Sequence, residues 1–360
     1  MLPELSNQLT ERERGILDRV DDYRDTIFAI LGFCSLWFFD ASTRERRSYI
    51  GVFQGRHLSP VCKKSSSLNT QPQKDVCPDL GVVIRAQTGI VGEVKKNFPS
   101  DDRRARKIFD QLNSYDQELT GWPTDNGELQ SHELALLVHQ TTSWAARRFY
   151  SRGVGDGSIK FERPFSIFVF NRSDQRVPYF FFQAVEGEIS AIEADLDPYQ
   201  GVPVPMQALM DLHSRSKLYD GEPPLPYLLD LIWEHVVIPL ASENTRFARL
   251  RSNQKLEVDV FVDDIVEKLH EGFSFSHWHT QYPDRQPLIP RKEWVLKACR
   301  FLVQSKEARW VTEDAELRVF YRKYQDVLGH FVRLQAESEA EKDLQPMFPM
   351  FEEGTSGSSN

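Results

Sequence analysis

Residues 77–84, with the sequence CPDLGVVI, and residues 88–96, TGIVGEVKK, decide the fold of this chain. Both runs are short and apolar and are flanked by turn residues, a pattern that predicts two neighbouring β-strands joined by a hairpin. Side chains two residues apart along a strand share a face. Glu93 and Lys95 therefore point the same way, and the hairpin is expected to bring Asp79 towards them.

The residue types in this hairpin indicate hydrolytic chemistry at a phosphate. Asp79 and Glu93 supply two carboxylates, the hard oxygen ligands that a divalent cation binds in proteins. A lysine beside them, here Lys95, is suited to stabilise developing negative charge or to orient a water molecule for attack on phosphorus. These three residues are the candidate catalytic set.

A helix is predicted after the second strand. Ser100-Asp101-Asp102 is a favourable N-cap with acidic residues in the first turn. The apolar residues that follow recur at helical spacing on one face, namely Ile108, Phe109, Leu112, Tyr115 and Leu119. Gln111 lies four residues before Tyr115, so their side chains are neighbours on the helix surface.

The order of these motifs resembles that of the PD-(D/E)xK nuclease superfamily. Pro78-Asp79, a 13-residue gap and Glu93-Val94-Lys95 match its two sequence motifs. Gln111 and Tyr115 match the QxxxY motif of its RecB-like branch. The resemblance implies a restriction-endonuclease-like fold of the α/β (α+β) class, in which helices flank a mixed central sheet.

The resemblance also implies roles for the matched residues of the hairpin. Asp79 and Glu93 would hold Mg²⁺, with Mn²⁺ as a substitute, and the backbone carbonyl of Val94 would assist them. Lys95 would position or polarise the attacking water. The metal would lower the pKa of that water and offset charge on the phosphate.

Further roles follow from the resemblance outside the hairpin. Gln111 and Tyr115 would contact the substrate backbone or brace the site. An additional catalytic glutamate is expected on the helix that precedes the first motif. Glu45 is the candidate and Glu13 the alternative, although Glu45 is equally well explained as a residue that caps its own helix.

The pattern around these motifs has the helix and strand order of such a core. The elements expected on either side are a helix at 9–31, a second helix at 42–53, a strand at 134–138, a helix at 143–150, and strands at 165–170, 179–184 and 188–196.

A change of composition near Asp197-Pro198 marks a domain boundary. Residues 1–200 are expected to form the nuclease-like domain, residues 201–340 a helical accessory region, and residues 341–360 a disordered tail. The helices expected in the accessory region are 206–218, 226–240, 260–270, 292–303 and 313–339. This region is interpreted either as winged-helix-like or as a dimerisation or partner-binding module.

Composition limits the partners. The 360 residues carry a net charge of −9, which argues against a protein that binds nucleic acid over its whole surface. A local basic patch remains after the second strand, and Lys96, Arg103 and Arg104 are its candidate DNA-contacting residues. The alternative is that these charges form a solvated helix face.

The spacing of the cysteines and the length of the apolar runs indicate where in the cell the protein is expected. The four cysteines are scattered without a CxxC pair, which disfavours a thiolate zinc site and favours reduced thiols in a cytoplasmic protein. The most apolar stretch, residues 26–39, is too short to span a bilayer comfortably and is expected to be a buried element.

Two functions from different classes follow. The leading hypothesis is a Mg²⁺-dependent DNA endonuclease or exonuclease in microbial defence or DNA processing, with homodimerisation as a means of cutting both strands. The alternative is a non-catalytic protein that keeps the nuclease fold and binds nucleic acid, or binds a protein through the helical region or the tail.

Overall fold

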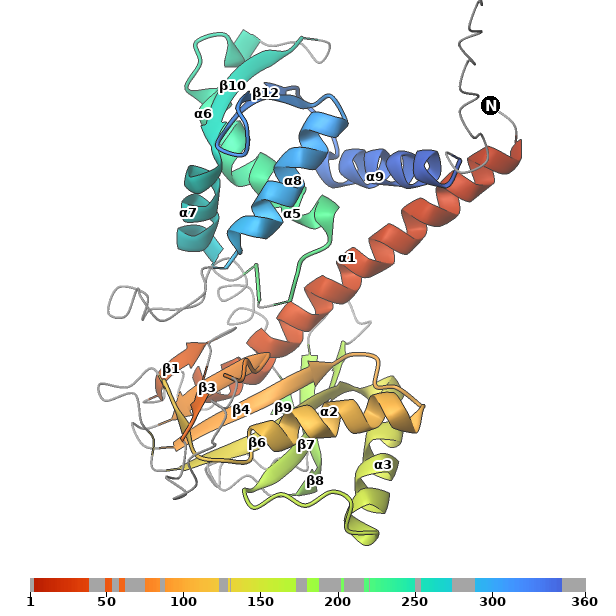
Figure 1. The fold of residues 1–360 in the computed structure, drawn as a ribbon, viewed down its shortest axis with the longest axis vertical. Coiled ribbons are helices and arrows are strands. Elements are labelled where there is room, and N and C mark those ends of the chain that lie inside the picture. Colours follow the sequence, from red (N-terminus) through yellow and green to blue (C-terminus); the bar gives the residue numbers. More distant parts are fainter. Residues whose placement is uncertain are drawn as a thin grey trace, which may run out of the picture. The chain divides into compact units, whose positions relative to one another are not determined.

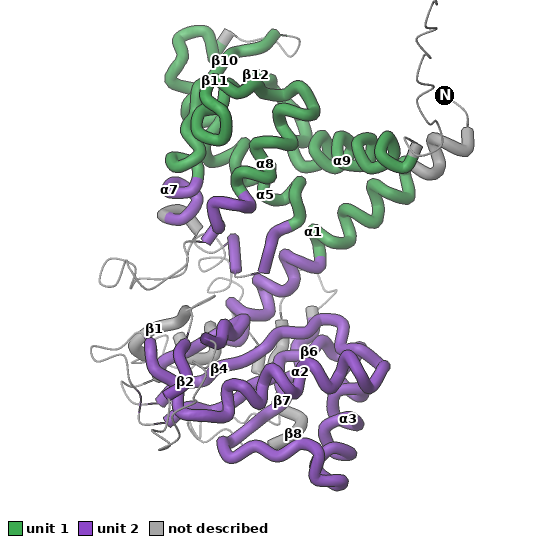
Figure 2. The backbone as a smooth tube through the Cα atoms, viewed as in Figure 1, with its two compact units in different colours: residues 1–21, 224–265, 295–360 green, residues 22–223, 266–294 purple. Residues whose placement is uncertain are grey.

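The computed structural model of the chain describes residues 3–38, 49–53, 58–61, 75–84, 88–122, 129, 131–172, 180–187, 202–203, 217–219, 221–249, 254–273 and 289–344. The chain forms two compact units (Figure 2). The sheet unit comprises residues 22–223 and 266–294, and the terminal unit comprises residues 1–21, 224–265 and 295–360. The division near residue 223 lies beyond the boundary expected at residue 200, and the first 21 residues group with the C-terminal part.

The sheet unit is built on a mixed seven-stranded sheet (Figure 1). Its strands in spatial order are β1 (Tyr49–Phe53), β3 (Leu80–Ile84), β4 (Thr88–Lys95), β6 (Ser131–His139), β7 (Phe165–Arg172), β8 (Phe180–Gly187) and β9 (Val202–Pro203). β4, β6 and β7 are parallel, whereas the pairs outside them are antiparallel. The chain is therefore of the mixed α/β class, and the predicted pairing of the strands at residues 80–84 and 88–95 is confirmed.

Helices cover the two faces of this sheet. α2 (Asp102–Ser114) and α3 (Ser143–Gly155) share a core with alternate residues of the strands, such as Val91 and Leu136. α1 (Pro3–Phe38) enters the sheet unit at Asp22, and its Phe33 packs edge-on against Phe168 of β7 at 4.9 Å between ring centres. The neighbours of Phe168 belong to the α2 core, so α1 covers the opposite face.

Most of the predicted elements are confirmed, with one error in the described part of the sheet unit. The helices expected at 9–31 and 143–150 and the strands at 134–138, 165–170 and 179–184 are present with longer or slightly shifted bounds. The helix expected at 42–53 is wrong for residues 49–53, which form β1 and pair with β3. The run Tyr-Ile-Gly-Val-Phe is rich in aromatic and β-branched residues, which favour a strand. The strand expected at 188–196 lies outside the described residues.

The terminal unit combines helices with a small sheet. Its elements are α5 (Leu225–Ile232), a π-helical turn (Trp233–Val237), α6 (Ile238–Ser242), β10 (Leu256–Phe261), α7 (Val262–Phe273), α8 (Lys292–Gln304), β11 (Ala308–Thr312), β12 (Glu316–Tyr321) and α9 (Val327–Leu344). α7 and α8 each cross the unit boundary. The strands form an antiparallel sheet in the order β10-β12-β11.

The expectation of a mainly helical C-terminal region missed this three-stranded sheet. The helix expected at 313–339 is replaced by β12 and α9, because Leu317, Val319 and Tyr321 are buried in alternation, as they are in a strand. The helix expected at 206–218 falls largely outside the described residues, as do the last residues of the expected tail. α9 extends to Leu344, so residues 341–344 are helical.

The first turns of α1 belong to the terminal unit because they pack on α9. Ile16 of α1 is buried against Val332 and Ala336. Arg12 pairs with Asp343 at 2.8 Å along the edge of the same contact. This long-range packing explains why the domain division does not follow the order of the chain.

One helical stretch of the described chain, Leu225–Ser242, is long and apolar enough to cross a membrane, with a mean hydropathy of 1.2. Of this stretch, 56% is buried within the protein, including Leu229, Ile232 and Trp233. The core helix of a soluble protein has the same properties. The apolar run at 26–39 forms part of α1, where Ile27, Ile30 and Phe33 are buried as expected.

Candidate active site

The site begins where β3 and β4 stop pairing through their backbones. Their last paired residues are Leu80 and Gly92, and Asp79 stands one residue beyond. Beyond the last backbone pair, the side chain of Asp79 continues the contact between the strands: its Oδ2 accepts a hydrogen bond from the backbone N–H of Val94 at 2.9 Å. The sequence Pro-Asp immediately before β3 thus places a second carboxylate on the ammonium group that Glu93 contacts.

Lys95 joins the two carboxylates. Its Nζ donates to Asp79 Oδ2 at 3.0 Å and to Glu93 Oε2 at 2.7 Å. Glu93 is fully buried, whereas the side chains of Asp79 and Lys95 remain 21% and 27% exposed. The set is therefore open to solvent on the side of Asp79 and Lys95 and closed behind Glu93.

Helix α2 closes the site behind Glu93. Gln111 Nε2 and Tyr115 Oη both donate to Glu93 Oε1, at 2.8 Å and 2.5 Å, and Gln111 Nε2 also donates to Tyr115 Oη at 3.0 Å. The helix begins with Asp101 as N-cap, whose carboxylate accepts from the N–H of Arg104. Spacing of four residues puts Gln111 and Tyr115 on one face, which explains why both reach Glu93.

Burial and the charges of the set shift three pKa values. Burial raises the pKa of Glu93, and the carboxylate of Asp79 raises it further, while Lys95 and Tyr115 oppose this change. Burial alone would lower the pKa of Lys95, but Asp79 and Glu93 outweigh it and raise that pKa. Burial, and then Glu93, raises the pKa of Tyr115. Lys95 therefore stays a cation and Tyr115 a hydrogen-bond donor at neutral pH.

His132 supports the end of α2 from the sheet. It is 3% exposed, and its Nε2 lies 2.7 Å from the carbonyl oxygen of Tyr115. A carbonyl only accepts, so Nε2 carries the proton of the neutral ring. Burial lowers the pKa of His132 to about 4, with Arg163 adding to this effect against the Tyr115 hydrogen bond. The pattern of the sequence gave no signal for this residue.

Acid should therefore destabilise the protein through His132. The unfolded chain takes up a proton near pH 6.5 and the folded chain only near pH 4, so the free energy of unfolding should fall as the pH drops between these values. The expected loss is roughly 2 to 3 kcal/mol. His132→Gln keeps an N–H donor without a titrating ring and should lack this part of the loss in urea unfolding at pH 7, 5 and 4. Identical pH profiles for the variant and the wild type would contradict the assignment.

The predicted basic patch is only partly available to a substrate. Lys96 Nζ is held by Asp22 at 2.7 Å and Asp25 at 2.6 Å, both on α1. Arg104 lies 3.5 Å from the carboxylate of Asp101 and is 80% exposed, and Arg103 is exposed on the first turn of α2. Lys96, the residue after β4, therefore links the end of that strand to α1, and the two arginines remain at the surface.

Of the two candidates for the additional glutamate, Glu13 does not join the set. Glu45 lies outside the described residues. Glu13 belongs to the terminal unit, where it lies 3.7 Å from Arg333 of α9. Asp22 and Asp25 are acidic residues that the sequence interpretation missed, although their spacing of three residues on a helix was a usable signal.

The two carboxylates could hold a hard cation such as Mg²⁺ or Mn²⁺, rather than a metal that prefers thiolate or imidazole ligands. No cluster of three or more His, Cys, Asp or Glu side chains suited to a metal occurs in the described part of the chain. Mg²⁺ commonly uses one or two carboxylates and completes its octahedron with water and substrate phosphate. Asp79 and Glu93, both within 3.0 Å of one ammonium group, meet that requirement.

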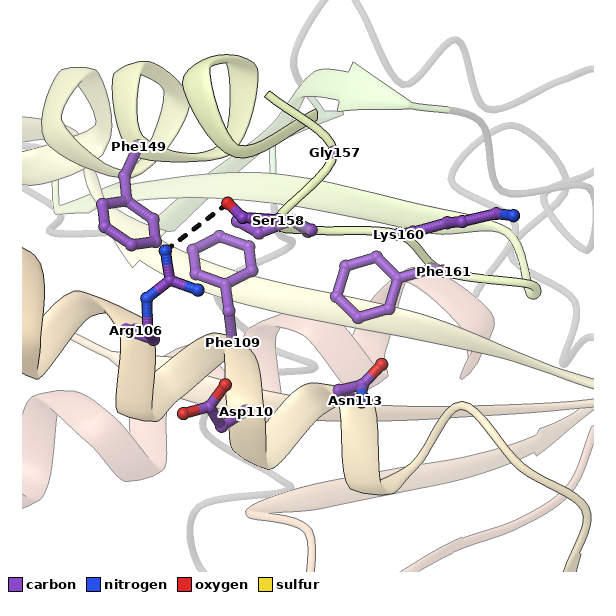
Figure 3. Close-up of a pocket in the computed structure, with 10 residues that line it drawn as sticks. Arg106, Phe109, Asp110, Asn113, Phe149, Gly157, Ser158, Lys160 and Phe161 are labelled. Atoms are coloured by element: carbon purple, nitrogen blue, oxygen red, sulfur yellow. Dashed lines mark hydrogen bonds between the residues drawn. The ribbon is translucent and has the colours of Figure 1, made fainter. Parts of the chain in front are cut away.

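A separate groove lies on the far flank of α2 (Figure 3). It encloses about 220 Å³ between α2 and residues 157–161 and is lined by side chains that include Arg106, Asp110 and Phe161. Arg106 donates to Ser158 Oγ across it at 3.4 Å. The side chains of the candidate site do not line the groove, so the two are distinct; they are Asp79, Glu93, Lys95, Gln111 and Tyr115.

Comparison with known proteins gives no assignment: no family model, no curated protein and no solved structure that was searched matches this chain.

Proposed function

We propose that the chain is a Mg²⁺-dependent DNA nuclease of the restriction-endonuclease-like type, which hydrolyses phosphodiester bonds. The observation that carries this proposal is the convergence of Asp79 and Glu93 on Lys95 at the open end of the β3–β4 hairpin. Two carboxylates and one ammonium in contact, with one side open to solvent, suit a metal-assisted attack on phosphorus.

The topology around the set supports the same proposal. Helix α1 precedes the antiparallel strands β1, β3 and β4, and helix α2 then connects β4 to the parallel strand β6. This is the order of the nuclease-like core to which the sequence motifs are similar. Because β4 and β6 are parallel, their carboxyl ends meet at one edge of the sheet, where α/β proteins bind ligands.

Charge balance favours a divalent cation at this edge. Once Glu93, whose pKa burial raises, has released its proton, Asp79, Glu93 and Lys95 carry one net negative charge, which would repel a phosphodiester. A bound divalent cation reverses this sign, offsets charge on the phosphate and lowers the pKa of water. Asp79 and Glu93 would hold the cation with the carbonyl of Val94.

The remaining residues of the set would position the reactants. Lys95 would orient the attacking water and stabilise the charge that develops on the phosphate. Gln111 and Tyr115 fix Glu93 through Oε1, which leaves Oε2 directed at Lys95. Arg103 and Arg104, exposed on the first turn of α2, would contact the DNA backbone.

The alternative is a non-catalytic protein in which the same set is a structural ion pair. The burial of Glu93, with both oxygens already hydrogen-bonded, favours this alternative. The two functions differ in their response to metal, because a structural ion pair does not need to open for a cation.

Titration calorimetry with Mn²⁺ tests the proposed function. The nuclease proposal predicts one site per chain in the folded protein, and competition with Mg²⁺ at the same site. Absence of binding by either ion to folded protein would favour the structural alternative.

A further inference from the structure

Helix α3 presents an unusual face to solvent. It buries Ala146, Phe149 and Gly153, and on the opposite side it carries an outer stripe that we define as Trp144, Arg147, Arg148, Ser151 and Val154. Trp144 is 59% exposed and Val154 is 50% exposed. They are the two strongly exposed large apolar side chains among the described residues of the sheet unit.

The stripe is also basic in an acidic protein. The run from Leu134 to Gly155 contains three arginines and no aspartate or glutamate, although the whole chain has a net charge of −9. Arg152, beside the stripe, is paired with Asp102 at 2.7 Å. Arg148 is exposed, and within the part of the chain that the structure describes no ion pair of Arg148 is found.

The start of the stripe lies next to the candidate active site. Val138 of β6 is level with Lys95 of β4, and the chain turns from there into α3. Thr142 Oγ1 donates to the carbonyl oxygen of Lys96 at 3.0 Å and accepts from the N–H of Phe98 at 3.2 Å. Trp144, two residues further on, is thereby tethered to the sheet edge that carries Lys95. Figure 1 shows α3 at the end of the sheet towards which β4 points.

We infer that the outer stripe of α3 binds single-stranded DNA, with Trp144 stacking on an unpaired base and Arg148 contacting a phosphate. The inference rests on the proposed nuclease function, because it names the form of substrate that reaches the same edge. An exposed indole offers its face only to a base that is not already stacked in a duplex. The arginines match a polyanion, and the absence of aspartate and glutamate from the run 134–155 lowers the local repulsion that an acidic chain exerts.

Fluorescence anisotropy with a labelled oligothymidylate in EDTA tests this inference. Trp144→Ala should weaken binding between about fivefold and 150-fold, the range that corresponds to the loss of one stacked base. Trp144→Phe, which keeps an aromatic face, should retain most of the affinity. The matched control is Phe261→Ala, because Phe261 is 52% exposed and lies in the other unit. It should bind like the wild type.

Other outcomes of the same experiment would overturn the inference. Unchanged affinity of folded Trp144→Ala would show that the indole does not contact the strand. An equal loss of affinity for a duplex of matched length would remove the preference for single strands. Tighter binding of oligouridylate than of oligothymidylate would show that the stripe prefers RNA to DNA. Conversion of a wild-type dimer to a monomer, with no change in DNA binding, would make the stripe a contact between copies of the chain.

The experiment separates this inference from the proposed function. Binding in EDTA does not need a metal or the carboxylates of Asp79 and Glu93. If the wild type binds single strands through Trp144 but never cleaves them with Mg²⁺, the nuclease proposal is contradicted and the inference about the stripe is supported. If cleavage is metal-dependent but Trp144→Ala changes neither binding nor cleavage, the inference about the stripe is contradicted and the nuclease proposal is supported.

Discussion

Lys95→Ala should lower Mg²⁺-dependent DNA cleavage by a factor of about 10² to 10³, the usual cost of removing one donor that stabilises charge in a transition state. The physical reason is the place of the ammonium, within 3.0 Å of both Asp79 and Glu93 at the solvent-exposed side of the set. Cleavage of a labelled oligonucleotide on denaturing gels, at saturating Mg²⁺, measures the effect.

A thermal melting curve of the same variant shows whether Lys95→Ala is folded. Removal of Lys95 leaves two carboxylates without a countercharge, so Mg²⁺ should raise the melting temperature of Lys95→Ala by more than that of the wild type. Lys268→Ala is the matched control, since Lys268 is an exposed lysine on α7. Its rate should equal that of the wild type. Wild-type cleavage by folded Lys95→Ala would show that any activity resides elsewhere in the chain.

Asp79→Asn should abolish cleavage for a different reason, because it removes a metal ligand. Asparagine can still accept the N–H of Val94 through Oδ1, so the end of the β3–β4 hairpin should survive. The loss of a ligand should weaken Mn²⁺ binding by more than the roughly 10- to 100-fold that is lost when the support of a ligand is mutated. Calorimetric titration measures this change, and Lys95→Ala should still bind the ion.

Asp75→Asn is the matched control for the metal ligand. Asp75 is an exposed acid four residues earlier, whose carboxylate accepts from Ser59 Oγ at 2.8 Å. It should bind Mn²⁺ and cleave DNA like the wild type. Equal Mn²⁺ affinity for Asp79→Asn and the wild type would remove Asp79 from the metal site.

Local pattern was enough to predict the strands and the helix that bring the candidate set together. The period of two places Glu93 and Lys95 on one face, and the hairpin between two adjacent runs leaves little choice of partner for Asp79. Spacing of four on a capped helix likewise placed Gln111 beside Tyr115. Each of these relations spans few residues and depends on one element or one turn.

The features that sequence missed depend on packing between distant segments. Lys96 is bound by Asp22 and Asp25, more than 70 residues earlier in the chain, so nothing local to Lys96 indicates its partners. The exposure of Trp144 depends on which face of α3 meets the α2 core, which composition does not specify. Residues 49–53 and 316–321 were assigned to helices because short apolar runs fit the period of a helix as well as that of a strand. Pairing with neighbouring strands, which the local sequence does not show, makes both segments strands.

The most direct test of the nuclease proposal is a cleavage assay with the wild-type protein on matched single-stranded and double-stranded DNA, with Mg²⁺, with Mn²⁺ and with EDTA. The proposal predicts cleavage of phosphodiester bonds with either ion, none in EDTA, and none with Asp79→Asn purified in parallel. Intact substrates under every condition, with protein that is folded and binds DNA, would contradict it.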